Sequence, residues 1–145
     1  MVRATPFLLV LFLALGAHGK KCNLTGDWKN DLGSNMTIYE VKENGDLTGT
    51  YLTSIIPPPL LGSQHLPDQL NQPTFGFTVH WNNSHASFYL RIHVVVFTGQ
   101  CFVDNEGKEI LKTMWLWRSH DNRLEDDWNA TVGFGGFITI IRTET

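Results

Sequence analysis

The sequence predicts an all-β protein, an eight-stranded antiparallel up-and-down β-barrel, and two observations lead to this prediction. After residue 20, short runs rich in Thr, Val, Ile and aromatic residues alternate with turn residues. No segment keeps the period of an amphipathic helix. Eight consecutive strands joined mostly by hairpin turns can close into a barrel that holds one small ligand. A β-sandwich is the alternative that this periodicity leaves open.

Turn residues divide the chain into its expected strands. The segments 31–33, 43–46, 82–83 and 104–107 are rich in Gly, Asn and Asp, which tolerate the positive φ of tight hairpins. Between these turns and the remaining breaks, we expect strands over residues 22–29, 35–42, 47–53, 61–70, 73–81, 88–103, 108–119 and 131–141.

The first 19 residues are expected to be a signal peptide rather than part of the barrel. Arg3 gives a positive start, residues 7–15 are almost entirely apolar, and Ala17 and Gly19 are small residues placed for cleavage after residue 19. This apolar run is too short to span a bilayer. We therefore expect a secreted, extracellular protein whose single domain covers residues 20–145.

Two further features agree with export. Cys22 and Cys101 are the only cysteines and are expected to pair in an oxidising compartment, two free buried thiols being the alternative. A disulfide that closes so long a loop stabilises by about 4–5 kcal/mol in the chain-entropy description. Four Asn-x-Ser/Thr sequons offer glycosylation sites, at Asn23, Asn35, Asn82 and Asn129.

The composition and motifs argue against several classes of function. A formal net charge of −3 at pH 7 does not favour nucleic acid or an anionic membrane as a partner. No nucleophile elbow and no Gly-rich phosphate loop is present, so we expect no enzyme activity. His80, His85 and His93 form the only histidine grouping, without cysteine or carboxylate ligands at helpful spacing, so neither a metal nor a cofactor is expected.

The strand around Trp115 predicts self-association. Alternation places Thr113, Trp115 and Trp117 on one face and Met114 and Leu116 on the other. If Trp115 points into the barrel, two bulky apolar residues point outward, and such residues on a soluble barrel favour a partner. The apolar strand 137–141 carries aliphatic side chains on both of its faces and leads to the same expectation.

Three long motifs follow one another along the chain. They are NDLGSNMTI at residues 30–38, QPTFGFTV at 72–79, and FTGQCF at 97–102 continuing to KTMW at 112–115. With the Asp127-Trp128 pair, they resemble the avidin and streptavidin family of biotin-binding proteins. The resemblance covers nearly the whole chain after residue 20. It implies the barrel, a homotetramer built as a dimer of dimers, and sequestration of biotin without chemistry on it.

The resemblance also implies the polar residues that would hold biotin. Asn30, Ser34 and Tyr51 stand where the family places three donors to the ureido oxygen. Thr53 stands where a hydroxyl accepts from a ureido nitrogen, and Ser84 is a polar match near the carboxylate end. Without the surrounding motifs, Asn30 and Ser34 would be ordinary turn residues and Tyr51 a strand aromatic.

Aromatic side chains are expected to enclose the same ligand. Trp81, Phe97 and Trp115 match walls within the subunit, and Trp128 matches the tryptophan that each subunit lends to its neighbour. Trp117 stands where the family commonly has a smaller aliphatic residue, so it either adds stacking area or crowds the cavity. The alternative is that these tryptophans are ordinary core residues.

Three segments depart from the family pattern. Gly135 or Gly136 occupies the place of the acceptor for the second ureido N–H, and an unsatisfied donor there costs about 1–3 kcal/mol unless water replaces the acceptor. The lid at residues 54–60 contains three prolines, which make it stiff and poor in N–H donors. Residues 88–94 have no counterpart that we can place.

These departures keep two alternatives open. The barrel could have lost its preference for biotin and carry another small apolar ligand, as a lipocalin-like carrier does. An interaction protein that merely oligomerises would have no ligand-sized cavity at all.

Overall fold

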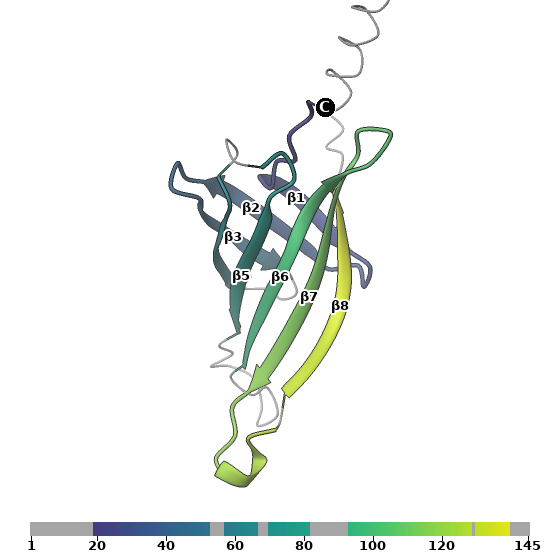
Figure 1. Ribbon diagram of the computed structural model, residues 1–145. Helices are drawn as coiled ribbons and strands as arrows, with labels where there is room; N and C mark the ends of the chain where they lie inside the picture. Colours follow the sequence, from purple (N-terminus) through teal and green to yellow (C-terminus); the bar gives the residue numbers. More distant parts are fainter. Residues whose placement is uncertain (1–18, 53–56, 67–69, 82–92, 129, 140–145) are drawn as a thin grey trace, which may run out of the picture.

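The eight strands form one closed antiparallel barrel (Figure 1). The computed structural model describes residues 19–52, 57–66, 70–81, 93–128 and 130–139. Each strand pairs with the next in sequence, and β8 pairs back with β1. The predicted fold class is confirmed, and the sandwich is excluded. The strands are β1 (Gly26–Asn30), β2 (Asn35–Val41), β3 (Asp46–Leu52), β4 (Pro59–Gln64), β5 (Thr74–Trp81), β6 (His93–Val103), β7 (Glu109–Ser119) and β8 (Ala130–Thr139).

The strands differ in length, and this difference shapes the barrel. Figure 1 shows β6, β7 and β8 as long, curved neighbours, while β1 and β2 are shorter. A 3₁₀ turn, η1 (Leu124–Asp126), lies in the connection from β7 to β8 and projects beyond the strands. Among the described residues, the ladder between β1 and β8 runs from the Trp28–Thr139 pair to the Asn30–Phe137 pair.

The bounds of two predicted strands were wrong. The first strand begins at Gly26 and not at residue 22, because the preceding N–H groups are used elsewhere. The N–H of Cys22 donates to the Asn71 carbonyl at 2.8 Å, and that of Thr25 to Asn23 Oδ1 at 3.0 Å. The strand predicted over 61–70 is β4, which starts at Pro59, a position where a missing N–H is tolerated, and ends at Gln64.

Parts of other predicted elements lie outside the described residues. These are residues 53, 67–69, 88–92 and 140–141 of four predicted strands, and the turn expected at 82–83. Of the segment 88–94 that the motifs could not place, His93 and Val94 belong to β6. The turns predicted around Gly33, Gly45 and Gly107 are confirmed, since all three glycines have positive φ of 79–91°.

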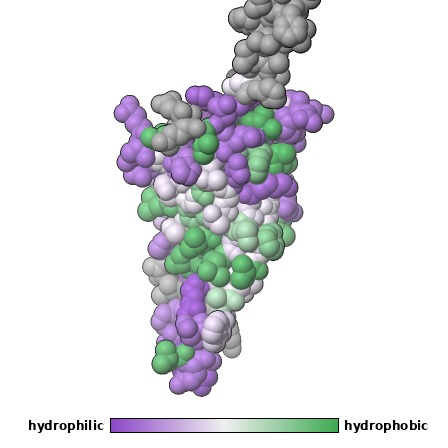
Figure 2. Space-filling view, in the orientation of Figure 1, coloured by the Kyte–Doolittle hydropathy of each residue, from purple (hydrophilic) through white to green (hydrophobic). Residues whose placement is uncertain are grey.

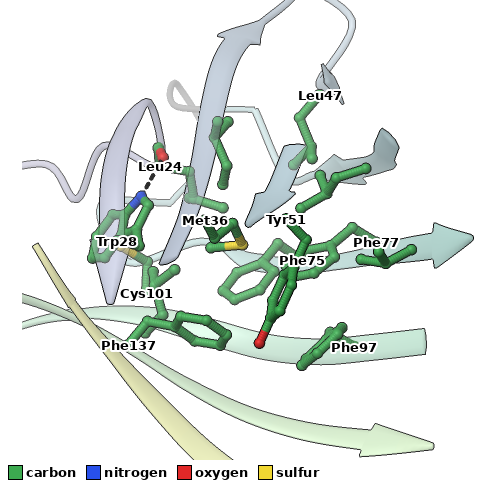
Figure 3. Packing of buried hydrophobic residues seen from close by; sticks show 14 of the residues in the cluster. Leu24, Trp28, Met36, Leu47, Tyr51, Phe75, Phe77, Phe97, Cys101 and Phe137 are labelled. Atoms are coloured by element: carbon green, nitrogen blue, oxygen red, sulfur yellow. Dashed lines mark hydrogen bonds between the residues drawn. The ribbon is translucent and has the colours of Figure 1, made fainter. Parts of the chain in front are cut away.

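Buried hydrophobic side chains pack together inside the barrel (Figure 3). Trp28 is fully buried there, and its indole N–H donates to the Leu24 carbonyl at 2.8 Å. Along β6, the inward side chains run from the fully buried Cys101 to His93, which is only partly buried. The barrel is therefore packed solid at the Cys101 end of β6 and open at the His93 end.

The predicted disulfide is present. Cys22 and Cys101 are bonded, with a sequence separation of 79 residues and a Cα–Cα distance of 5.9 Å. Both cysteines are buried. The bond joins the segment that precedes β1 to the C-terminal end of β6.

Apolar side chains lie on the outside of the barrel, as the alternation in β7 predicted. Met114 and Leu116 of β7 are each nearly half exposed, and Val132 and Phe134 of β8 are more exposed still. Figure 2 shows hydrophobic side chains gathered on the face that carries these strands. Within the ranges that the structure describes, no helix has the length and apolar character needed to cross a bilayer.

Candidate ligand-binding site

The open end of the barrel contains a cavity of about 600 Å³. This volume is typical of pockets for small ligands. Side chains from six strands and the first hairpin turn line it, and most of its surface is aromatic or aliphatic. A ligand-sized cavity is present, so a barrel that merely oligomerises does not account for the structure.

Asn30 lies at the polar end of the cavity, and the turn that follows β1 fixes its orientation. Asn30 Oδ1 accepts from the N–H groups of Leu32 at 3.1 Å and Ser34 at 2.8 Å. The amide oxygen is thus used by the turn, and the amide nitrogen points inward. Asn30 Nδ2 donates to the Tyr51 hydroxyl at 2.8 Å. The turn therefore converts an ordinary hairpin asparagine into a donor that faces the cavity.

Tyr51 extends from β3 into the same end of the cavity. Its ring stacks on Phe97 with centroids 5.8 Å apart and meets Trp81 edge-on at 5.6 Å. In Figure 3 its hydroxyl oxygen points toward the space between Phe97 and Phe137. Burial raises the pKa of Tyr51, while side-chain hydrogen bonding to Ser34 and then Asn30 opposes this effect. The phenol is therefore neutral at physiological pH and keeps a proton to donate.

The raised pKa of Tyr51 predicts a loss of stability at alkaline pH. A phenol in the unfolded chain ionises near pH 10, before the buried one does. Its stabilising contribution is thus complete below about pH 10 and is lost as the pH rises through the folded value. We expect the difference in unfolding free energy between wild type and Tyr51→Phe to shrink above about pH 10. A difference that stays constant from about pH 8 to 11 would contradict this account.

An aromatic wall continues from Phe97 along β5, β6 and β7. Phe77 and Phe97 are stacked with centroids 4.8 Å apart. Trp115, the cross-strand partner of Phe97, lies over Gly133 of β8. A Cβ added at Gly133 would come within 2.1 Å of the Trp115 ring. The missing side chain at Gly133 therefore leaves the room that the Trp115 indole occupies.

Three rings line the mouth of the cavity. His93 stacks on Trp117 with centroids 4.1 Å apart and on Trp81 at 5.0 Å, and the two indoles are 6.1 Å apart. All three planes lie within 18° of one another. The Trp117 indole N–H donates to Ser119 Oγ at 3.1 Å. Trp117 thus extends the aromatic wall at the mouth.

Gly135 and Gly136, in the middle of β8, leave space that a neighbouring carboxylate occupies. Gly136 N donates to Asp31 Oδ2 at 3.0 Å, and the Gly135 carbonyl accepts from Thr113 Oγ1 at 3.0 Å. Asp31, Thr113 and Gly135 all line the cavity. Asp31 is thus a carboxylate at the site that the sequence analysis did not single out, although it follows Asn30 directly.

The structure brings together most of the predicted site residues, and their contact with a ligand stays a prediction. Asn30, Ser34 and Tyr51 meet at the polar end, and the aromatic walls come from Trp81, Phe97, Trp115 and Trp117. Trp128 does not join them: it is 91% exposed beyond β7. Thr53 and Ser84 lie outside the described residues, as do the sequons at Asn82 and Asn129. Asn23 and Asn35 are exposed.

His93 is the pocket residue that the sequence analysis considered only as a metal ligand. The period-2 alternation from Phe97 through Val95 places it on the inward face, and this signal was available in the sequence. Among the described residues, no group of three or more His, Cys, Asp or Glu side chains could hold a metal ion.

The site combines neutral donors at one end, aromatic walls, and an open mouth. These features define a small-molecule-binding β-barrel protein. The family model described as "Avidin family" matches residues 18–140, and the chain belongs to this family.

Individual relatives agree over nearly the full length. The chain is 49% identical to avidin of Gallus gallus in an alignment of 158 positions, gaps included, which covers 99% of each protein. It is 48% identical to avidin-related protein 4/5 of Gallus gallus over the same share. Among solved structures, it is similar to Xenavidin, with 45% identity, a TM-score of 0.72, and coverage of 83% of this chain and 100% of that one. A biotin-binding protein from chicken matches with 38% identity, a TM-score of 0.70, and coverage of 83% and 98%.

Proposed function

We propose that this protein is a secreted, non-catalytic binding protein that sequesters biotin in the open end of its barrel. The observation that carries the proposal is the convergence of Asn30, Ser34 and Tyr51 at the polar end of a cavity of about 600 Å³ in a chain of the avidin family. A biotin-binding protein among the structural relatives supports the choice of ligand.

The ureido oxygen of biotin would accept from the three convergent donors. Asn30 Nδ2 already points inward, and the neutral Tyr51 hydroxyl and the Ser34 hydroxyl complete the set. Several donors aimed at one oxygen in a largely dry cavity offset the cost of removing a strongly hydrogen-bonding group from water. Thr53 would accept from one ureido N–H, and Ser84 would contact the carboxylate end.

The second ureido N–H needs an acceptor, and Gly135 and Gly136 offer no side chain. The Asp31 carboxylate, held by Gly136 N at 3.0 Å, lies beside this position and lines the cavity. It would supply the acceptor that the glycines lack. The rings of biotin would lie against Trp81, Phe97, Trp115 and Trp117, which exclude water from these hydrogen bonds.

We infer that the protein is a homotetramer, a dimer of dimers. The exposed Met114, Leu116, Val132 and Phe134 support an interface on the outer face of β7 and β8. A hollow of about 650 Å³ on the same side, lined in part by Met114 and Phe134, offers a place for a partner's side chains. Trp128, 91% exposed in the isolated chain, would close the pocket of a neighbouring subunit.

Export is part of the same proposal. Residues 1–19 would be removed as a signal peptide, leaving the barrel domain of residues 20–145. The disulfide between Cys22 and Cys101 supports an oxidising destination, and the exposed Asn23 and Asn35 are accessible to glycosylation. With a net charge of −3, the protein would not use nucleic acid or a membrane as a partner, and biotin would be its only ligand.

Calorimetric titration of the oxidised protein with biotin tests the proposal. We expect one biotin per chain, and a Kd raised about 10- to 100-fold in Tyr51→Phe, which lacks one strong hydrogen bond. Tyr39→Phe is the matched control, because Tyr39 is 61% exposed and its hydroxyl lies 2.9 Å from Thr50 Oγ1 outside the cavity.

Two outcomes of this titration would contradict the proposal. Equal weakening in both variants would show that Tyr51 has no special contact with biotin. A folded oligomer that gives no heat with biotin would favour the lipocalin-like alternative, in which the pocket takes another small apolar ligand. That alternative depends on two features: a glycine, Gly135 or Gly136, where the family has a side-chain acceptor, and the bulky Trp117 at the mouth.

A further inference from the structure

Two glycines on the inner face of β8, Gly133 and Gly135, differ in what occupies the space beside them. Alternation places both on the side of the buried Phe137, so a side chain at either position would point into the barrel. At Gly133, the Trp115 indole takes this room. At Gly135, apart from its chain neighbours, an added Cβ would have only Thr113 Oγ1 within 4 Å, at 3.7 Å. The space at Gly135 is therefore part of the cavity, which Gly135 and Thr113 both line.

This space lies next to the polar end of the cavity. Phe137 pairs with Asn30 in the ladder between β1 and β8, and its ring meets Tyr51 edge-on with centroids 6.3 Å apart. Gly135 is two residues from Phe137 along β8, a distance of about 7 Å in an extended strand. A small ring bound by Asn30 and Tyr51 would therefore lie within reach of the space at Gly135.

The side chains beside this space offer acceptors. The Thr113 hydroxyl donates its proton to the Gly135 carbonyl at 3.0 Å, so its oxygen is left to accept. The Asp31 carboxylate lines the cavity, and its Oδ2 accepts from Gly136 N at 3.0 Å. Over the described residues, no other group donates to this carboxylate and no cation pairs with it. A carboxylate accepts more than one hydrogen bond, so a ligand group that enters this space is favoured if it brings N–H donors.

We propose that the space at Gly135 is a subsite for a small, hydrogen-bond-donating substituent on the ureido nitrogen that faces β8. The inference rests on the proposed function and names a class of ligand that the same cavity takes: cyclic ureas with an amino group, or a similarly small donor, on that nitrogen. The amino N–H groups would donate to Asp31 and Thr113. The ureido oxygen would still accept from the donors at the polar end.

The size of residue 135 would then determine which ligands fit. Gly135 is not one of the glycines with positive φ, so alanine can adopt its backbone conformation without strain. The nearest contact of the new Cβ, at 3.7 Å, is an ordinary van der Waals distance. Gly135→Ala should therefore fold, and its methyl group would take the room that the substituent needs. A substituted ligand would then overpack the site, which is unfavourable.

The test is competition titration of the intact oxidised protein with biotin and with its N-amino and N-methyl derivatives, each prepared at either ring nitrogen. Amino and methyl groups are nearly equal in size, so the difference between them measures hydrogen bonding. We expect wild type to bind one N-amino isomer within about three-fold of biotin, and the matching N-methyl isomer about ten-fold more weakly. In Gly135→Ala, both should weaken a further 10- to 100-fold or so, about 1–3 kcal/mol, relative to biotin.

Gly76→Ala is the matched control. Gly76 lies between the buried, inward Phe75 and Phe77 on β5, so it faces outward, and it does not line the cavity. This variant should keep the wild-type ratio of affinities for each derivative and biotin.

Biotin is the reference ligand for each protein, so failure of this proposal can be told from failure of the proposed function. No binding of biotin to the folded wild type would overturn both. Binding of biotin with every substituted isomer more than about 100-fold weaker would overturn the subsite alone. Equal ratios in wild type and Gly135→Ala would overturn the role of Gly135. Equal affinity of wild type for the N-amino and N-methyl isomers would overturn the role of the acceptors, and this comparison does not depend on how a variant folds.

Discussion

Gly133→Ala is expected to weaken biotin binding by about a hundred-fold, equivalent to about 2.7 kcal/mol. The added Cβ would lie 2.1 Å from Trp115 Cζ2, well inside van der Waals contact, so the indole must move. Trp115 forms part of the pocket wall, and its displacement opens that wall to water. Because a side chain rather than the backbone gives way, we expect the free energy of unfolding to fall by about 1–3 kcal/mol, comparable with the loss in binding free energy. Titration with biotin and denaturant unfolding measure the two effects separately.

Gly76→Ala provides the matched control. It is the same substitution in another strand of the barrel, β5, and its Cβ would meet nothing closer than the Phe97 carbonyl oxygen at 3.4 Å. We expect its Kd for biotin to match that of wild type. If Gly133→Ala also binds biotin with wild-type affinity, the Trp115 indole does not contribute to the wall in the way described.

Loss of the disulfide is expected to lower the free energy of unfolding by about 4–5 kcal/mol. Cys22 and Cys101 are 79 residues apart, so the bond restricts most of the unfolded chain. Replacing both by alanine avoids placing hydroxyl groups at two buried positions. The measurement is urea unfolding of the double variant beside oxidised wild type. A midpoint that does not change would show that the segment before β1 is held by its other contacts alone.

The barrel could be predicted from the sequence because the turn residues and the alternation of side chains along each strand agree with the way the strands pair. Gly33, Gly45 and Gly107 take the positive φ that their turns require, and alternation assigned Met114 and Leu116 correctly to the outside. The boundaries of β1 and β4 could not be predicted this way. The Cys22 N–H donates to Asn71, which is distant in the sequence, and the Thr25 N–H donates to the side chain of Asn23. A strand pattern indicates neither of these acceptors.

The motifs predicted which residues form the polar end of the site. How their side chains are oriented could be seen only in the structure. Two N–H groups of the turn donate to the amide oxygen of Asn30, and for this reason its amide nitrogen faces the cavity. The proximity of Asp31 to Gly136 joins residues 105 positions apart and has no local signature. His93 was missed for a different reason: the uncertain segment 88–94 obscured an alternation that continues into it from Phe97.

The ladder between β1 and β8 connects ligand residence time to local opening of the barrel. A closed barrel has no edge strand, so local opening must break a ladder, and within the described residues this one runs from Trp28 to Asn30 on β1. Asn30 and Phe137, paired at its end, both line the cavity. A bound molecule that contacts both would hold the two strands together and slow hydrogen exchange there. Conversely, each transient separation of β1 from β8 would carry the Asn30 donor away from the ligand, so the rate of this separation sets a limit on how long the complex lasts.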